Sequence, residues 1–597
     1  MSRPHSTTLI AACCLGAAAA LAACSVPPAQ PAVAEPISAP PSVAQEVVPA
    51  AAEAPTEAQL PAPAQALALA KAQTREAQAT TRMAPPPMAT EQWQHMPAPL
   101  PTPPVMPDGD GERYAELRAN PVWVAAEQPV STFSVDVDTG AYANVRRLLN
   151  AGQLPPRDAV RVEELINYFD YAYAPPKDRA TPFALHTELG PTPWNPKTEL
   201  LAIGIQGWKP AAASIRPSNL VFLVDVSGSM QSADKLPLVK ASLKLLAGQL
   251  TARDRISLVV YAGRTEVVLE PTPGDQTATI VAALDRLEAG GSTDGASGIQ
   301  LAYAMAEKAF MKDGNNRVLL ATDGDFNVGL RDVGQLREMV ENKRRNGVAL
   351  STLGFGTGNY NDALMEQIAD VGNGHYSYID SAREAQRVLV EERASALETI
   401  ASDVKIQVEF NPAVVAEYRL IGYENRLLRR EDFNNDAIDA GDIGAGHRVT
   451  ALYEIARVGS GGEKVDALRY GQAAKAGAGM AGELAQLKLR YKRPEDGVDA
   501  RSRLIARVVR ADEAVTADRT SPAFRLAAAV AAYGQLLRGG EYTQRYALRD
   551  AAALASAAQV DQASGRAAEF VELARLAASL NGERLLVSGD DHPAGAH

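Results

Sequence analysis

Cysteine is scarce in this sequence. The chain has 597 residues and three cysteines, Cys13, Cys14 and Cys24, all near the N-terminus. If the first 23 residues are removed, as their pattern predicts, a single thiol remains. A chain with one cysteine has no internal disulfide and no paired-thiol redox or zinc motif. The cysteine content therefore excludes a disulfide-stapled scaffold and dithiol chemistry in the mature chain.

Several enzyme motifs and one class of partner are also missing. The sequence contains no Gly-x-Ser-x-Gly elbow, no phosphate-binding P-loop and no His-Glu-x-x-His zinc motif, and it has only seven histidines. The formal net charge is −12, and no basic stripe interrupts it. An acidic chain is repelled by phosphate backbones. We expect a protein that is not an enzyme and that binds neither nucleic acid nor nucleotide.

The N-terminus carries a targeting pattern. The stretch "MSRPHSTTLIAACCLGAAAALAACS" has a short polar start, an apolar run and the box Leu21-Ala22-Ala23-Cys24. This box matches the bacterial lipoprotein cleavage site, which predicts removal of residues 1–23 and lipidation of Cys24. An ordinary signal peptide with an incidental cysteine is the alternative.

A lipid anchor would place the protein in the cell envelope. No later run is long and apolar enough to span a bilayer, so the lipid on Cys24 is the expected membrane attachment. Ser25 in place of an aspartate favours the outer membrane, facing the periplasm. Residues 24–110 are rich in proline and alanine, as in "APPPMA" and "LPTPPVMP". Such a composition sustains no sheet and predicts a disordered, semi-stiff tether.

The folded part divides by its hydrophobic periodicity. Residues 111–180 predict an N-terminal α+β accessory module, with a strand at 133–137 and helices at 142–149 and 161–171. From 217 to 398, buried strands such as "NLVFLVDV" alternate with amphipathic helices. This alternation predicts a mostly parallel, doubly wound α/β sheet of Rossmann-like type with helices on both faces.

The period changes on either side of this α/β domain. Residues 400–510 alternate apolar and polar side chains, as in "DVKIQVEF", which predicts the half-buried strands of a β-sandwich. Residues 181–216 contain a similar strand, "TELLAIGIQG". That strand either joins the later sandwich, with the α/β domain inserted into it, or forms an edge of the α/β sheet. Residues 511–590 predict a C-terminal helical region.

Five oxygen-bearing side chains mark a candidate site in the α/β domain. Asp225, Ser227 and Ser229 follow the first buried strand, Thr293 lies in "GGSTDGAS", and Asp323 ends another buried strand. The carboxyl ends of parallel strands meet at one edge of a sheet, so these side chains are expected to converge there. A set of oxygens without histidine or cysteine suits a hard cation, Mg²⁺ first and Mn²⁺ or Ca²⁺ as alternatives.

The expected ligand set has chemical consequences. Three of the five groups are neutral hydroxyls, so the cation would stay electron-poor and would accept a carboxylate from outside. The acids Asp294 and Asp325 stand beside the predicted ligands. They either strengthen metal binding or serve as a helix cap and a solvated loop acid.

The residues Asp225-x-Ser227-x-Ser229, with the later Thr293 and Asp323, resemble the metal-ion-dependent adhesion site (MIDAS) of the von Willebrand factor type A (VWA) domain. The resemblance covers about 180 residues and implies the Rossmann-like fold, a divalent metal and a protein ligand that presents an acidic residue. The flanking stretches "FSVDVDTGAYANVRR" and "AAAVAAYGQLL" resemble bacterial lipoproteins that carry this domain between two accessory regions.

Three functions are considered: the one that the resemblance implies and two alternatives to it. The first is an envelope lipoprotein that binds a partner through the metal in adhesion. The second is a structural or assembly-assisting envelope protein whose metal site is not essential. The third is a hydrolase of unknown substrate.

Overall fold

The computed structural model describes residues 111–583, with short gaps. The gaps are residues 136, 212–213, 292–294, 325–332, 439, 467, 470–479, 481, 498–499 and 561–563. The predicted signal peptide, Cys24 and the tether lie outside the described residues. Among the described helices, none has the length and apolar character needed to cross a membrane.

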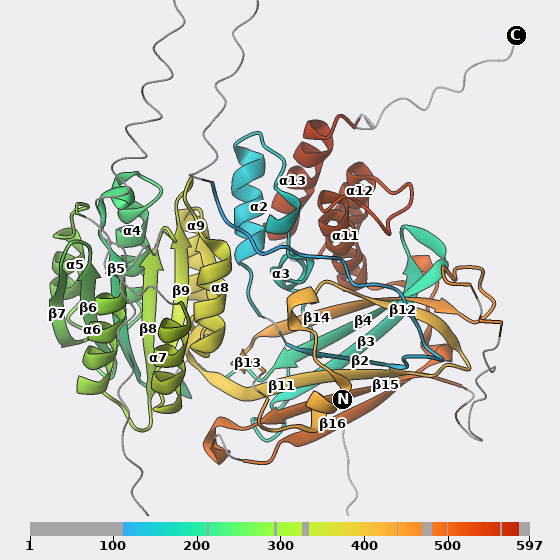
Figure 1. Ribbon diagram of the computed structural model, residues 1–597, viewed down its shortest axis with the longest axis horizontal. Helices are drawn as coiled ribbons and strands as arrows, with labels where there is room; N and C mark the ends of the chain where they lie inside the picture. The colour runs from blue at the N-terminus through green and yellow to red at the C-terminus, as the bar shows by residue number, and fades with distance from the viewer. Residues whose placement is uncertain are drawn as a thin grey trace, which may run out of the picture. The chain divides into compact units, whose positions relative to one another are not determined.

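A six-stranded sheet forms the centre of the α/β domain (Figure 1). Its order is β10-β9-β8-β5-β6-β7, and every neighbouring pair is parallel except β6 with β7. The strands are β5 (Ser218–Asp225), β6 (Arg255–Tyr261), β7 (Thr265–Pro273), β8 (Asn315–Thr322), β9 (Ala349–Phe355) and β10 (Tyr376–Ile379). The helices are α4 (Leu236–Ala247), α5 (Thr277–Asp285), α6 (Gly295–Lys308), α7 (Val333–Arg345), α8 (Asp362–Val371), α9 (Ala382–Gln386), a π-helix (Arg387–Glu391) and α10 (Arg393–Leu397).

Burial on both faces explains the apolar run of the central strand. Leu220 and Phe222 of β5 pack into a cluster with α4 and α5, whereas Val221 and Leu223 pack into a second cluster with α6 and α7. All eight residues of β5 are buried. A strand that is covered on both sides has no face exposed to solvent, so its sequence is continuously apolar and does not alternate with polar residues. This is the Rossmann-like α/β fold that the sequence predicted.

Two further sheets pack face to face as a β-sandwich. One has the order β1-β12-β14-β4-β3, and the other has the order β13-β11-β15-β16 with β2 paired to β11. Both contribute to one core, through Ile203 and Ile205 of β4 and through Ile406 and Val408 of β11. The strands are β1 (Trp123–Val124), β2 (Val130–Ser134), β3 (Phe183–Thr192), β4 (Asn195–Gly207), β11 (Thr399–Phe410), β12 (Val415–Ile421), β13 (Gly441–Gly444), β14 (Arg448–Arg457), β15 (Glu483–Lys492) and β16 (Arg503–Arg510).

The strand predicted within residues 181–216 belongs to the sandwich. β4 pairs antiparallel with β14 over eight residue pairs, from Gln206 with Arg448 to Glu199 with Ile455. The α/β domain is therefore inserted between β4 and β11 of the sandwich.

Residues 111–180 differ from the expected separate module. β1 pairs with β12 and β2 pairs with β11, so both strands are part of the sandwich. The helices α2 (Gly140–Asn150) and α3 (Val162–Asn167) share a core with the C-terminal helices. The second helix is shorter than the predicted 161–171. This segment lacks enough apolar surface to form a core alone, so its elements join cores built by later residues.

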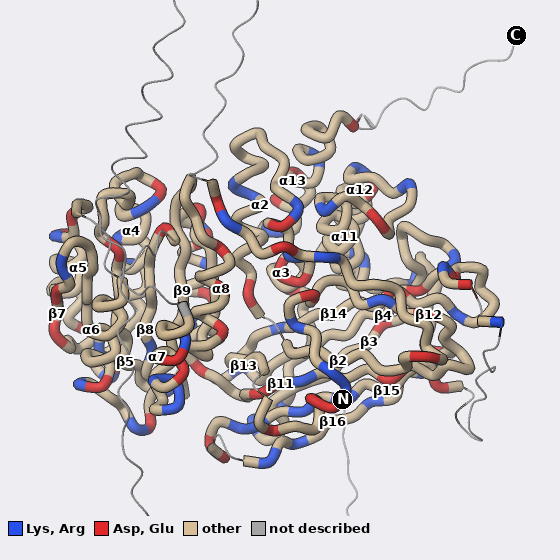
Figure 2. The backbone as a smooth tube through the Cα atoms, viewed as in Figure 1, with Lys and Arg blue, Asp and Glu red and all other residues tan. Residues whose placement is uncertain are grey.

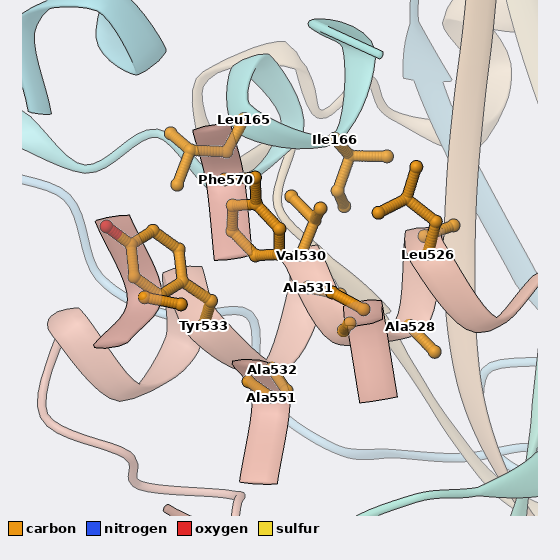
Figure 3. Packing of buried hydrophobic residues seen from close by; sticks show 14 of the residues in the cluster. Leu165, Ile166, Leu526, Ala528, Val530, Ala531, Ala532, Tyr533, Ala551 and Phe570 are labelled. Atoms are coloured by element: carbon orange, nitrogen blue, oxygen red, sulfur yellow. The ribbon is translucent and has the colours of Figure 1, made fainter. Parts of the chain in front are cut away.

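Three C-terminal helices complete the described chain: α11 (Pro522–Leu537), α12 (Leu548–Ala558) and α13 (Arg566–Leu580). Figure 3 shows Leu526, Val530 and Tyr533 of α11 gathered with Leu165 of α3 and Phe570 of α13. Ser521 begins α11 as an N-cap, because its hydroxyl accepts a hydrogen bond from Phe524 N. The same core includes residues of β4, β12 and β14, so these helices cover that sheet.

Charged residues are interspersed along the described chain. Figure 2 shows short basic and acidic segments alternating over both the α/β domain and the sandwich.

Candidate metal site

The turn after β5 fixes Asp225 beneath the edge of the sheet. Asp225 has no exposed surface, and its Oδ1 accepts a hydrogen bond from Ser227 N at 2.8 Å. Its Oδ2 accepts from the hydroxyls of Tyr261 at 3.2 Å and Thr322 at 3.0 Å. Three donors on two neighbouring strands and the turn hold the carboxylate in one orientation. This arrangement suits a group that positions other ligands or a bound water.

The two serine hydroxyls meet at the surface of this turn. Ser227 Oγ and Ser229 Oγ are 3.0 Å apart. Two neighbouring ligands of an octahedral Mg²⁺, each about 2.1 Å from the ion, are separated by about 3.0 Å. The spacing of these hydroxyls therefore fits two adjacent positions around such an ion, with Ser229 exposed and Ser227 buried.

Asp323 reaches the site from the end of β8. It forms an ion pair with a lysine that the sequence did not indicate as part of the site. Its Oδ2 lies 2.9 Å from Lys235 Nζ, and both side chains are buried. Lys235 stands at the start of α4, where a lysine would ordinarily point into solvent. The aliphatic part of Lys235 packs against Gly356, whose φ of +77° and lack of a Cβ leave the necessary room. One ammonium group thus partly neutralises the acids of the site.

The electrostatic state of Asp225 reflects this environment. Burial raises the pKa of Asp225 to about 6, and the nearby charge of Asp323 adds to the effect. Hydrogen bonds from Ser227 and Thr322 act in the opposite direction without cancelling the effect of burial. A buried carboxylate that is costly to ionise is stabilised when a divalent cation lies near it.

Thr293, Asp294 and Asp325 lie outside the described residues, so their predicted roles remain predictions. The chain before Thr293 nevertheless reaches the site. Gly290 N donates to Val226 O at 2.8 Å, and Gly228 N donates to Gly291 O at 3.0 Å. These two bonds hold the loop after α5 against the serine turn. The structure therefore brings together Asp225, Ser227, Ser229 and Asp323.

The first described residues lie against the edge of the sheet that carries the site. The loop 356–361 follows β9, and its Asn359 accepts a hydrogen bond from Lys235 Nζ at 3.5 Å. Arg113 N donates to Tyr360 O at 2.8 Å, and Gly358 N donates to Glu112 Oε1 at 3.2 Å. Residues 112–113 therefore support a loop next to Asp323, which the sequence did not indicate.

Asp138 of "DVDTG" at 136–140 has no place in this site. Asp138 is buried and its Oδ1 accepts a hydrogen bond from Tyr376 N at 2.9 Å. Asp136 lies outside the described residues. Asp138 thus joins the segment before α2 to β10, which is a structural role.

The donor set determines what this arrangement can hold. Within the described residues, no three histidine, cysteine or carboxylate side chains gather as a metal cluster. The candidate site instead combines two carboxylates with two hydroxyls, which is the donor set of a hard cation with positions left for water or an outside oxygen. The residues present therefore fit Mg²⁺ or Mn²⁺.

Family models match three parts of the chain. Residues 219–391 match the von Willebrand factor type A domain, residues 108–202 match a von Willebrand factor model, and residues 395–580 match the C-terminal region of the uncharacterized protein YfbK. The first match covers the α/β domain with the candidate site. The other two cover the sandwich strands and the C-terminal helices.

Known proteins resemble the chain to different extents. The uncharacterized protein YfbK of Escherichia coli K12 is 48% identical over 472 residues, which are 78% of this chain and 81% of YfbK. The magnesium-chelatase 60 kDa subunit of Cereibacter sphaeroides is 40% identical over 114 residues, only 19% of this chain and 20% of that protein. The solved von Willebrand factor type A protein of Catenulispora acidiphila is 16% identical, with a TM-score of 0.37, over 64% of this chain and 88% of its own.

Proposed function

Because this chain belongs to the family of bacterial VWA-domain proteins related to YfbK, we propose that it binds a protein partner through a divalent cation at the Asp225 site. VWA domains mediate protein–protein interaction and adhesion, and proteins that carry them are mostly not enzymes. In this proposal Ser227, Ser229 and Thr293 bind the ion directly. Asp225 and Asp323 act mainly through water or hydroxyl groups.

The pair of serine hydroxyls is the observation that carries this proposal. They lie 3.0 Å apart on a turn whose buried side is fixed by Asp225. The ion, when bound, supplies a Lewis-acidic position that an acidic side chain of the partner fills. The ligands from this chain include neutral oxygens, so an outside carboxylate is attracted and not merely tolerated.

We extend the proposal to the ion and the location. Mg²⁺ is the expected ion, because the donors are hydroxyl and carboxylate oxygens and magnesium prefers such ligands. In this proposal Cys24 carries the lipid that anchors the protein in the outer membrane, facing the periplasm. The tether then keeps the metal site within reach of other envelope proteins.

A metal-dependent capture experiment tests the binding function. The mature chain, immobilised through its C-terminus, is incubated with detergent-solubilised envelope extract in Mg²⁺ or in EDTA. We expect partners that are captured only with Mg²⁺ and that are lost with Ser229→Ala. Ser229 is exposed, so its replacement by alanine removes a hydroxyl ligand without disturbing the core.

Two controls make this test decisive. Ser232→Ala removes a neighbouring exposed hydroxyl, which donates to Asp234 and not to the site, and should change nothing. Titration with Mn²⁺ alone measures the affinity of the chain for the ion, independently of any partner. Identical partners in EDTA and Mg²⁺, together with unchanged capture by Ser229→Ala, would contradict the proposal.

A further inference from the structure

A cavity of about 550 Å³ opens beside the candidate metal site. Its lining comes from three segments, which are the turn after β5, the hairpin of β6 and β7, and the chain after α5, and it combines five apolar residues with charged residues and glycines. The apolar residues are Val226, Val260, Ala262, Val268 and Leu287. Four of these five side chains are at most 8% exposed. The cavity is therefore a recess in the packed domain and not a gap between loose loops.

The cavity and the metal site share one turn. Val226, which lines the cavity, stands between Asp225 and Ser227 in the chain. Its carbonyl accepts the hydrogen bond from Gly290 N, and Gly290 also lines the cavity. Consecutive Cα atoms are about 3.8 Å apart, so the Cα atom of Val226 in the cavity wall lies about that distance from the Cα atoms of Asp225 and Ser227. A ligand bound at the metal would lie directly beside this recess.

Three local features shape the recess. A Cβ on Gly290 would meet no atom within 4 Å, so the position faces free space. Gly291 has a φ of +90°, and a Cβ there would lie 3.1 Å from Gly263 N. On the opposite wall, β7 has one residue more than β6 at Val268, because Leu258 pairs with Leu269 and Val259 with Val267. Such a bulge redirects a side chain out of the regular strand pattern.

The charges around the rim balance one another. Arg264 pairs with Glu266 at 3.1 Å, and Arg286 and Glu288 stand on the segment after α5. A rim with both signs of charge suits a polar peptide backbone and favours neither an anion nor a cation. The five apolar residues of the lining, four of which are largely buried, favour an aliphatic side chain.

We propose that this cavity is a specificity pocket for an aliphatic side chain of the partner, close in sequence to the acid that binds the metal. An extended segment advances about 3.3 Å per residue, so a side chain near the acid in sequence can reach a recess that begins one residue from the site. The proposal rests on the proposed metal-dependent function and names the partner's chemistry: an extended segment with one acid and one nearby leucine, isoleucine or valine. Burial of that side chain adds affinity that the metal alone does not provide.

A peptide series tests the pocket. The probes are fluorescein-labelled ten-residue peptides of glycine and serine with one central aspartate. Leucine replaces a residue at each position from three before to three after the aspartate. Anisotropy is measured with the mature chain in Mg²⁺ and in EDTA. We expect leucine at one position to tighten binding at least about ten-fold over serine, because burial of a leucine side chain contributes that much.

Variants of the chain separate the pocket from the metal. Val268→Glu places a charge in the lining, on β7 and outside the predicted ligand set, and should remove the gain from leucine while the aspartate still binds in Mg²⁺. Val268→Ile keeps the wall apolar and should retain the gain. Gly290→Phe fills the free space and should also remove the gain. If one of these variants does not fold, the other still gives the result.

The outcomes distinguish the two proposals. If binding depends on Mg²⁺ but leucine and serine peptides bind equally, the pocket is wrong and the metal function stands. If no peptide binds more tightly in Mg²⁺ than in EDTA, the proposed function itself is contradicted. If the chain dimerises in sedimentation velocity and Val268→Glu abolishes the dimer, a second copy fills the cavity, and the inference of a partner peptide is overturned.

Discussion

Two groups of buried charges in the described chain differ in how they are neutralised. At the candidate metal site, the carboxylates of Asp225 and Asp323 are buried close together, and the ammonium group of Lys235 pairs with Asp323. In a second group, defined here as the arginine cluster of Arg146, Asp380, Glu384 and Arg387, both guanidinium groups contact Glu384, and Arg146 also pairs with Asp380. At its edge, Glu392 pairs with Arg387 and Glu569 with Arg146. Arg146 lies 2.8 Å from Glu384, and Arg387 lies 2.5 Å from it.

The pKa values of the central acids follow this difference. Burial raises the pKa of Asp225 to about 6. Burial acts in the same direction on Glu384, but Arg387 and Arg146 outweigh it and lower its pKa to about 2. In the arginine cluster, Glu384 has two guanidinium groups of the same chain as partners, and the cluster holds elements together. At the candidate metal site, Asp225 accepts hydrogen bonds from hydroxyl groups and Asp323 pairs with one ammonium group, and we propose that a cation complements these carboxylates.

The largest expected effect comes from breaking the arginine cluster. Glu384→Ala leaves Arg146 and Arg387 without their shared buried partner, and we expect a loss of about 3 to 5 kcal/mol in the free energy of unfolding. Urea titration in EDTA and in Mg²⁺ should give the same loss, since the metal is not involved. Glu341→Ala, which removes an exposed ion pair with Arg345, is the control and should cost under about 0.5 kcal/mol.

The second effect is a pH dependence carried by Glu384. Its pKa is about 2 in the folded chain against an ordinary value of 4.5, so its contribution to stability is complete above about pH 4.5 and disappears as the pH falls towards 2. The shift corresponds to about 3 kcal/mol. The difference in unfolding free energy between the wild type and Glu384→Gln should therefore shrink between pH 4.5 and 2.5. A constant difference would show that the arginines do not set this pKa.

The third prediction concerns the single cation of the metal site. Lys235→Met keeps much of the aliphatic side chain and removes the charge beside Asp323. In EDTA we expect the free energy of unfolding to fall by about 2 to 3 kcal/mol, because a buried ion pair loses one partner. Mg²⁺ should restore more of the stability of this variant than of the wild type, since the ion then has no competing ammonium group. Equal stabilisation of both proteins by Mg²⁺ would mean that Lys235 and the ion do not interact.

The fourth prediction is a variant with the smallest effect on stability and a large effect on metal affinity. Ser229→Ala changes an exposed hydroxyl, so in EDTA the unfolding free energy should move by less than about 0.5 kcal/mol. Calorimetric titration with Mn²⁺ should nevertheless show binding weakened at least about ten-fold, because one ligand is lost. Unchanged Mn²⁺ affinity would remove Ser229 from the ligand set.

Much of the site could be predicted because it lies in local patterns. The apolar strand that ends at Asp225, the two serines after it and the acid at 323 are readable in short stretches, and the structure brings these four residues together. Lys235 could not be predicted, because a lysine at a helix start has no local sign of burial. Tyr261 and Thr322 act on Asp225 only through strand neighbours.

The flanking regions were harder to predict for the same reason. Residues 111–180 contain the right strand and helix types, yet β2 pairs with β11 across a separation of more than 250 residues, as in Phe133 with Ile406. Periodicity indicates that a strand exists, but it does not indicate its partner. The strand at 195–207 left two alternatives open in the sequence, and its pairing with β14 decides between them.

The sequence by itself determined that oxygen-bearing side chains end buried strands of an α/β sheet, because periodicity and turn residues are local properties. Tertiary structure alone decided that Lys235 neutralises Asp323, that a recess opens beside Val226, and that the chain before α2 joins a distant sheet. These features depend on which surfaces pack together when several layers form at once. The free energy of that packing is shared among residues far apart in the chain, so no short stretch records it.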